Sequence, residues 1–154
     1  YKRVDLAIEA FNDLDLPLWV AGEGSEFLRL KSKAGANIRF LGRVGEAERI
    51  RLYAECRAFV FPGKEDFGIA PLEANASGKP VIAFAAGGAM ETLNARTAVF
   101  FQEPTAASLK QAVLQLEKTI PKMNPKFMIQ NARRFSEKVF LNKMKSFFGS
   151  LECK

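Results

Sequence analysis

The sequence predicts an α/β protein with a doubly wound parallel sheet, followed by additional C-terminal helices. Apolar residues alternate along the chain between a helical spacing and short continuous runs, which is typical of repeated strand–helix–strand units. Most of the strand-like runs are continuously apolar, as expected when helices cover both faces of a parallel sheet. Glycines follow several of these runs. Because ligands bind beyond the carboxyl ends of parallel strands, we expect a binding site at that edge.

Each element in the first part of the chain follows from a local pattern. An apolar strand ends at Gly22, and Ser25 is predicted as the N-cap of the charged helix that follows. Trp19 is expected in the core of its strand. The inward-facing residues of the next helix are expected to be Ile50, Leu52, Tyr53 and Cys56. The predicted order is helix at 4–11, strand at 16–21, helix at 25–33, strand at 38–41, helix at 46–56 and strand at 58–61.

The second part continues the alternation and then becomes helical. Gly78 and Pro80 are expected to end a short helix, and Met90 to begin a further helical turn. The predicted elements are a helix at 71–77 and strands at 81–84 and 98–101. The helical pattern beyond them is broken near Pro121 and Pro125. We expect residues 1–104 to form the α/β core and residues 105–154 to form basic terminal helices.

Composition limits the possible chemistry. The 154 residues, nearly half of them apolar, suffice for one folded domain. The sequence contains no His, which excludes Ser–His or Cys–His catalysis and a His-ligated metal within this chain. Cys56 and Cys153 follow no metal-binding spacing, so a reducing compartment, the cytoplasm, is expected. No apolar run reaches the ~18 residues that span a bilayer. Since the chain begins at Tyr1 without a Met, we expect a piece of a longer protein or a truncated start.

The net charge of +6 comes from the C-terminal part, where residues 105–154 hold ten Lys and Arg against three Asp and Glu. The aromatic residues of that part, which recur at core-like spacing, are Phe135, Phe140, Phe147 and Phe148. The simplest interpretation is that the basic residues cover the solvated faces of terminal helices. A membrane surface or an acidic neighbouring domain remains an alternative partner, and no nucleic acid is expected.

The most informative segment is residues 61–73, in which Glu65 and Glu73 flank a strand-to-helix turn. Gly68 allows the backbone to approach a ligand closely, and the amides near Ile69 stand at the start of the helix. A helix start attracts anions through its unpaired amides and its dipole. Amides suit phosphates and carboxylates suit sugar hydroxyls, so the segment predicts a nucleotide-sugar site.

These motifs resemble the donor-binding half of family 4 glycosyltransferases, the retaining enzymes of GT-B fold. The resemblance runs through residues 2–11, 20–24, 40–44, the Glu65/Glu73 pair, 77–83 and 87–92. Residues 61–68 look most like mannosyltransferases of the WbaZ type. The resemblance implies transfer of mannose from GDP-mannose to an acceptor hydroxyl with retained configuration. It also implies no cofactor and no metal.

The resemblance also implies individual roles. Glu65 matches the acid beside the transferred sugar and is the catalytic candidate, through positioning and charge stabilisation. Glu73 matches the acid that binds the ribose hydroxyls, and Lys2 a lysine that neutralises the diphosphate. The other donor-binding candidates are Gly22 near the nucleotide, Gly42, Arg43 and Val44 at the base pocket, and Phe67, Gly68 and Ile69, whose backbone would cradle the sugar and diphosphate.

The family's first strand and its N-terminal acceptor domain would lie before Tyr1. A glycan or lipid-linked acceptor is therefore expected to bind through that missing domain. A further hypothesis is that the basic C-terminal helices contact the inner face of the membrane peripherally. One alternative is an isolated nucleotide-sugar-binding module without turnover. Another is a different Rossmann-like nucleotide-binding domain, such as a dehydrogenase domain, although no Gly-x-Gly-x-x-Gly follows a first strand.

Overall fold

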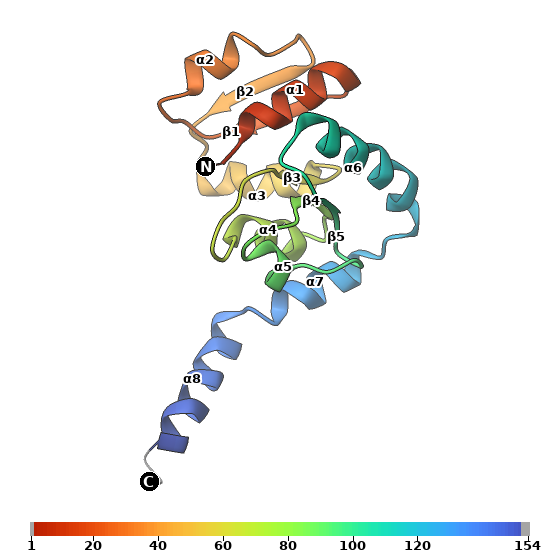
Figure 1. Ribbon diagram of the computed structural model, residues 1–154. Coiled ribbons are helices and arrows are strands. Elements are labelled where there is room, and N and C mark those ends of the chain that lie inside the picture. The colour runs from red at the N-terminus through yellow and green to blue at the C-terminus, as the bar shows by residue number, and fades with distance from the viewer. Residues whose placement is uncertain (1, 152–154) are drawn as a thin grey trace.

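The computed structural model describes residues 2–151 and confirms the predicted α/β alternation. Figure 1 shows the strands in the body of the molecule, with helices packed around them. The elements are α1 (Val4–Leu14), β1 (Leu18–Ala21), α2 (Phe27–Lys31), β2 (Ile38–Gly42), α3 (Glu46–Glu55), β3 (Phe59–Phe61), α4 (Ile69–Ala76), β4 (Val81–Phe84), α5 (Ala89–Thr92), β5 (Ala98–Phe101), α6 (Ala106–Thr119), a 3-10 turn (Ile120–Lys122), α7 (Pro125–Arg133) and α8 (Glu137–Leu151).

All strand pairings among the described residues are parallel, but the strands form two separate sheets. One sheet pairs β1 with β2, with Leu18 opposite Ile38. The other has the order β3-β4-β5, with Val81 opposite both Phe59 and Ala98. Each strand is joined to the next by a helical segment, which is the connection that parallel strands require. The fold is therefore a parallel, Rossmann-like α/β fold with additional C-terminal helices, as predicted.

The two sheets share one hydrophobic core beneath α1 and α6. It combines Leu6, Ala7, Ile8, Ala10 and Phe11 of α1 with Ile38, Ile82, Val99, Phe101, Leu109, Ala112, Val113 and Leu116. A second cluster lies on the other face of β3–β5, against α4 and α5. It contains Phe61, Ala74, Val81, Ala83, Ala89, Leu93 and Ala98. Successive residues of β4 therefore point into different clusters, which explains why the sequence of β4 is apolar throughout.

Three local predictions were wrong. Trp19 is 51% exposed, because residues of β1 alternate between half-buried and exposed. Its indole lies opposite Arg39 of β2, whose guanidinium is 6.0 Å from the ring centroid. The helix predicted from Ser25 begins only at Phe27 and has no side-chain cap. Ile50 is exposed, since α3 buries none of its residues fully.

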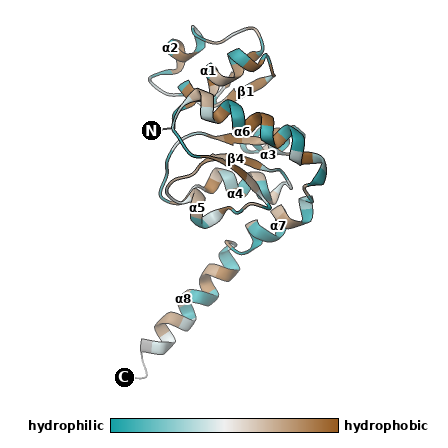
Figure 2. Cartoon of the chain, turned by 45° about the vertical axis from the view of Figure 1, so that its right-hand side comes forward, coloured by the Kyte–Doolittle hydropathy of each residue, from teal (hydrophilic) through white to brown (hydrophobic). Residues whose placement is uncertain are grey.

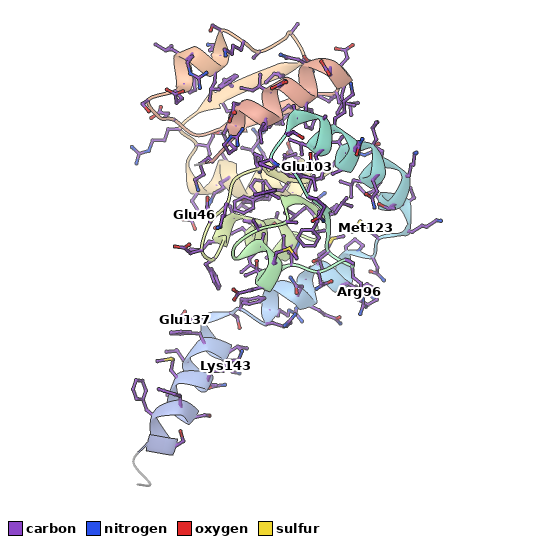
Figure 3. The ribbon with its side chains drawn as sticks, viewed as in Figure 1. Glu46, Arg96, Glu103, Met123, Glu137 and Lys143 are labelled. Carbon is purple, nitrogen blue, oxygen red and sulfur yellow. The ribbon has the colours of Figure 1, made fainter. Side chains whose placement is uncertain are left out.

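The C-terminal helix α8 leaves the body of the molecule in both ribbon views (Figures 1 and 2). Its aromatic spacing predicted core residues, and this was wrong for Phe140, Phe147 and Phe148, which are all exposed. Figure 3 places Glu137 and Lys143 on this helix, away from the strands. Between residues 2 and 151, no helix combines the length and the hydrophobicity that a membrane crossing requires.

Helix α7 is anchored by the buried amide of Asn131, which is 4% exposed. Its Nδ2 donates to Oδ1 of Asn75 in α4 at 3.1 Å and to the carbonyl of Thr92 in α5 at 2.7 Å. Its Oδ1 accepts from Nδ2 of Asn94 at 3.2 Å. One side chain thus joins α7 to the two helices that cover the second cluster.

We expect Asn131→Ala to lower the free energy of unfolding by about 2–3 kcal/mol, because it leaves the Asn75 and Thr92 oxygens buried without a donor. Urea denaturation measures the change. Asn142→Ala removes an exposed amide from α8 and is the matched control, for which little change is expected. Equal stabilities of the two variants would show that Asn131 does not anchor α7.

Candidate functional site

The candidate site forms where β3 leads into α4. Phe61 ends the strand in the second cluster, and a loop at residues 62–68 carries the chain to the helix. Gly68 precedes the helix with φ of 83°, a left-handed conformation that favours glycine. A side chain there would meet Phe61 and Pro71 only at ordinary contact distances, so the dihedral angle is what requires glycine. The turn leaves the amide of Ile69 at the start of α4, before the first intrahelical bonds.

Glu65 in this loop forms an ion pair with Lys2. The two residues are 63 positions apart in the sequence, and the contact brings the segment before α1 to the loop after β3. The Glu65 side chain is half-buried, whereas Lys2 is exposed. The structure therefore brings together two of the residues that sequence reasoning selected. A cation beside an acid can take part in binding a ligand that carries both phosphate and hydroxyl groups.

Glu73 in α4 has two partners from α3. Nη1 of Arg49 lies 2.7 Å from Oε1 of Glu73, and the hydroxyl of Tyr53 donates to Oε2 at 3.2 Å. Burial, and then the neighbouring Glu73 carboxylate, raise the pKa of Tyr53, so its hydroxyl stays a proton donor. Sequence reasoning placed Tyr53 on the inner side of its helix and did not select Arg49. The signal that identifies both is their spacing of four residues, which puts them on one helix face.

The Gly87–Gly88 turn, which follows β4, packs directly on the loop that holds Glu65. The amide of Gly88 donates to the carbonyl of Glu65 at 2.8 Å. A Cβ at Gly87 would lie 2.4 Å from the same carbonyl oxygen, and one at Gly88 would lie 2.3 Å from the carbonyl oxygen of Asp66. Neither position accepts a side chain, so the turn holds the backbone of residues 65–67 in place.

The remaining predicted residues lie at the ends of β1 and β2. The amide of Gly22 donates to the carbonyl of Gly42 at 2.7 Å, and both glycines have positive φ. The amide of Arg43 donates to the Glu23 carboxylate at 3.3 Å. The Arg43 side chain is exposed and Val44 is half-buried. A hydrogen bond thus joins Gly22 to Gly42 directly. The Arg43 amide bonds to Glu23 and not to the candidate acids Glu65 and Glu73.

The aromatic ring of Phe67, another predicted site residue, packs edge-to-face on Phe135 with 5.9 Å between centroids. The neighbouring Ile69 side chain is exposed. Over residues 2–151, the structure contains no group of three or more His, Cys, Asp or Glu side chains placed to hold a metal ion.

We expect Gly88→Ala to lower the free energy of unfolding by about 1–3 kcal/mol, because the added methyl group overlaps the backbone of Asp66 and Phe67. Thermal or urea unfolding measures this. Gly24→Ala is the matched control, since a Cβ there meets nothing within 4 Å. If the two variants were equally stable, the loops would not be in the close contact described.

Several curated glycosyltransferases resemble this chain, among them a rhamnosyltransferase and a mannosyltransferase. D-rhamnosyltransferase WbpZ of Pseudomonas aeruginosa is 30% identical over 122 residues, covering 73% of this chain and 32% of that protein. A second relative comes from Corynebacterium glutamicum and is named GDP-mannose-dependent monoacylated alpha-(1-6)-phosphatidylinositol monomannoside mannosyltransferase. It is 32% identical over 113 residues, covering 66% of this chain and 30% of that protein. The matched region spans about a third of the length of these relatives.

Solved structures of glycosyltransferases share the fold. A glycosyltransferase from Rickettsia africae superposes with a TM-score of 0.85 at 22% identity, over 97% of this chain and 44% of its own. Anabaena HepE in complex with UDP-glucose gives a TM-score of 0.77 at 20% identity, over 100% of this chain and 46% of HepE. At these identities the likeness establishes the fold, which is that of GT-B glycosyltransferases.

The family described as glycosyl transferases group 1 matches residues 1–135. This match covers all strands, the two candidate acids and the glycine turns that hold them. The chain belongs to the group 1 glycosyl transferase family.

Proposed function

We propose that this chain binds the nucleotide-sugar donor of a retaining glycosyltransferase of family 4, and that the donor is GDP-mannose. The observation that carries the proposal is the arrangement around α4. Gly68, with a left-handed backbone conformation, opens the helix. Glu65, which pairs with Lys2, precedes it, and Glu73 lies on the helix itself. Both acids are accessible enough to meet a ligand, since neither is fully buried.

The diphosphate is assigned to the start of α4. The backbone of Phe67, Gly68 and Ile69 would supply donors, and the positive end of the helix favours the anion. Lys2 would share its charge between Glu65 and the diphosphate. Its ion pair with Glu65 supports this role, because the pair puts a cation beside the acid assigned to the sugar.

The nucleoside is assigned to the other elements of the same edge. Glu73 would accept hydrogen bonds from the ribose hydroxyls. Gly22, Gly42, Arg43 and Val44 would border the base. Their position at the carboxyl ends of β1 and β2 supports this assignment, because ligands of open parallel sheets bind there.

The proposed reaction breaks the bond between the anomeric carbon and the diphosphate oxygen. The acceptor hydroxyl forms the new bond on the same face, and its proton passes to a phosphate oxygen of the leaving group. Glu65 would hold the sugar and stabilise positive charge at the anomeric carbon. Lys2 and the α4 amides would stabilise the departing diphosphate, so positioning and electrostatics supply the catalysis without a metal or a cofactor.

The choice of mannose and guanosine rests on sequence likeness. Residues 61–68 resemble WbaZ-type mannosyltransferases, and the Corynebacterium relative is named as GDP-mannose-dependent. The competing donor is UDP-glucose, which the structurally similar Anabaena HepE binds.

The acceptor is assigned to a part of the protein outside this chain, because the relatives are about three times as long as the region they share with it. The separation of the strands into two sheets also supports a strand that lies outside this chain. In the doubly wound order 3-2-1-4-5-6, β1 and β2 would be the second and third strands, and the first would lie between β1 and β3. The isolated chain would then bind the donor without efficient turnover.

We expect the chain to bind GDP-mannose in calorimetric titration, and Glu73→Ala to weaken binding at least about tenfold, because lost hydrogen bonds to a charged group cost about 1.5–3 kcal/mol. Glu9→Ala, which removes an exposed acid from α1, is the control and should bind as the unmodified chain does. Binding of NAD but not of a nucleotide sugar would refute the proposal, and preferred binding of UDP-glucose would refute the choice of donor.

We propose a second function for α8, contact with an anionic lipid surface. At 100° per residue, the exposed side chains of Phe140, Leu141, Phe147 and Phe148 share one face of the helix. Lys138, Lys143 and Lys145 lie on its two flanks. Aromatic and aliphatic residues between lysines are typical of helices that lie in the membrane interface. The Corynebacterium relative, named for a phosphatidylinositol mannoside, agrees with a lipid setting.

Sedimentation with vesicles tests this contact. The chain should sediment with phosphatidylserine-containing vesicles and much less with pure phosphatidylcholine. Phe147→Asp should abolish sedimentation, whereas Ser146→Asp adds the same charge on the opposite face and should reduce it far less. Absence of salt-sensitive binding, or a dimer in solution that Phe147→Asp dissociates, would show that lipid does not cover this face.

A further inference from the structure

We propose that Tyr53 and Arg49 of α3 are positioning residues that orient the Glu73 carboxylate toward the ribose of the bound nucleotide. This inference rests on the proposed function, since it assigns the ribose hydroxyls to Glu73. It adds the two residues that would decide how well this acid distinguishes a ribonucleotide from a nucleotide without those hydroxyls.

The contacts fix both oxygens of the carboxylate. Oε1 meets the Arg49 guanidinium at 2.7 Å, and Oε2 accepts from the Tyr53 hydroxyl at 3.2 Å. Two anchors on different oxygens define the plane of the group as well as its position. A carboxylate offers about four acceptor sites, so each oxygen keeps capacity for a sugar hydroxyl. A ligand can therefore bind without displacing either anchor.

Tyr53 is itself held in place by aromatic packing. Its ring is half-buried and lies edge-to-face on Phe59 of β3, with 5.5 Å between centroids. Phe59 stacks on Phe61 at 6.3 Å, and the Phe61 ring lies beside Gly68. The same strand thus supports the hydroxyl that holds Glu73 and the turn that opens α4. The two parts of the proposed site share one rigid support.

Electrostatics fix the direction of the hydrogen bond. Burial of the Tyr53 side chain, and then the neighbouring Glu73 carboxylate, disfavour a tyrosinate. The Tyr53 hydroxyl therefore remains the donor in this hydrogen bond and the Glu73 carboxylate the acceptor. Arg49 supplies a permanent positive charge on the other oxygen. The carboxylate is prepared to accept hydrogen bonds before any ligand arrives, which lowers the ordering cost of binding.

Calorimetric titration of the whole chain with GDP and with 2′,3′-dideoxy-GDP tests the inference. Tyr53→Phe keeps the ring and removes only the hydroxyl. It should weaken GDP binding about three- to tenfold, the cost of leaving one side chain mobile, and leave dideoxy-GDP binding unchanged. Arg49→Ala should act in the same way. Arg51→Ala, an exposed arginine of α3 that pairs with Glu48, should change neither affinity.

A cycle with Glu73 separates this inference from the proposed function. If Tyr53 acts through Glu73, the double variant Tyr53→Phe/Glu73→Ala should bind GDP as Glu73→Ala alone does. Equal weakening of both nucleotides by Tyr53→Phe would indicate a merely structural role and overturn the inference. Tighter GDP binding by Arg49→Ala would show that Arg49 competes with the ligand and would also overturn it. If Glu73→Ala weakens the binding of GDP and of dideoxy-GDP by the same factor, the ribose assignment itself fails.

Discussion

The contact between the Gly87–Gly88 turn and the backbone of residues 65–67 is the constraint on which the candidate site depends. The amide of Gly88 holds the carbonyl of Glu65, and the two glycines leave no room for a side chain between the loops. Glu65 is therefore positioned by main-chain packing from the neighbouring strand and not by its own flexible loop. The left-handed Gly68 then turns the chain into α4. Binding residues on loops need such support, because small displacements of a site lower its activity greatly.

The two acids are held by different means, which fits their different proposed roles. Glu65 pairs with Lys2, an exposed side chain at the start of the described chain. Ion pairs near the surface contribute little to stability, so sharing the charge of Lys2 with an anionic ligand would cost little. Glu73 is held on both oxygens by Arg49 and Tyr53 of one helix. The proposed sugar side of the site is thus adaptable, whereas the proposed ribose side is preorganised.

Much of this arrangement was predictable from the sequence, because the determining signals are local. Continuous apolar runs predicted the buried parallel strands, and Gly68 between two glutamates predicted the turn. The family resemblance assigned Lys2 and Glu65 to the same donor, but the ion pair between them is a long-range contact that neither the resemblance nor periodicity predicted. Arg49 was missed because its spacing of four residues from Tyr53 puts both on one helix face but does not show that this face meets Glu73. Trp19 and the phenylalanines of α8 were misplaced since apolar character predicts burial only where another element covers the residue. The exposed face of α8 shows the same limit.

The central claim is that Glu65 and Glu73 bind opposite ends of one nucleotide sugar. A crystal structure of this chain with GDP-mannose tests it most directly. We predict the mannose beside Glu65, the diphosphate at the amides that open α4, and the ribose hydroxyls within hydrogen-bonding distance of a Glu73 carboxylate still held by Tyr53. A nucleotide bound elsewhere on the chain, or bound at α4 with neither glutamate in contact, would contradict the account.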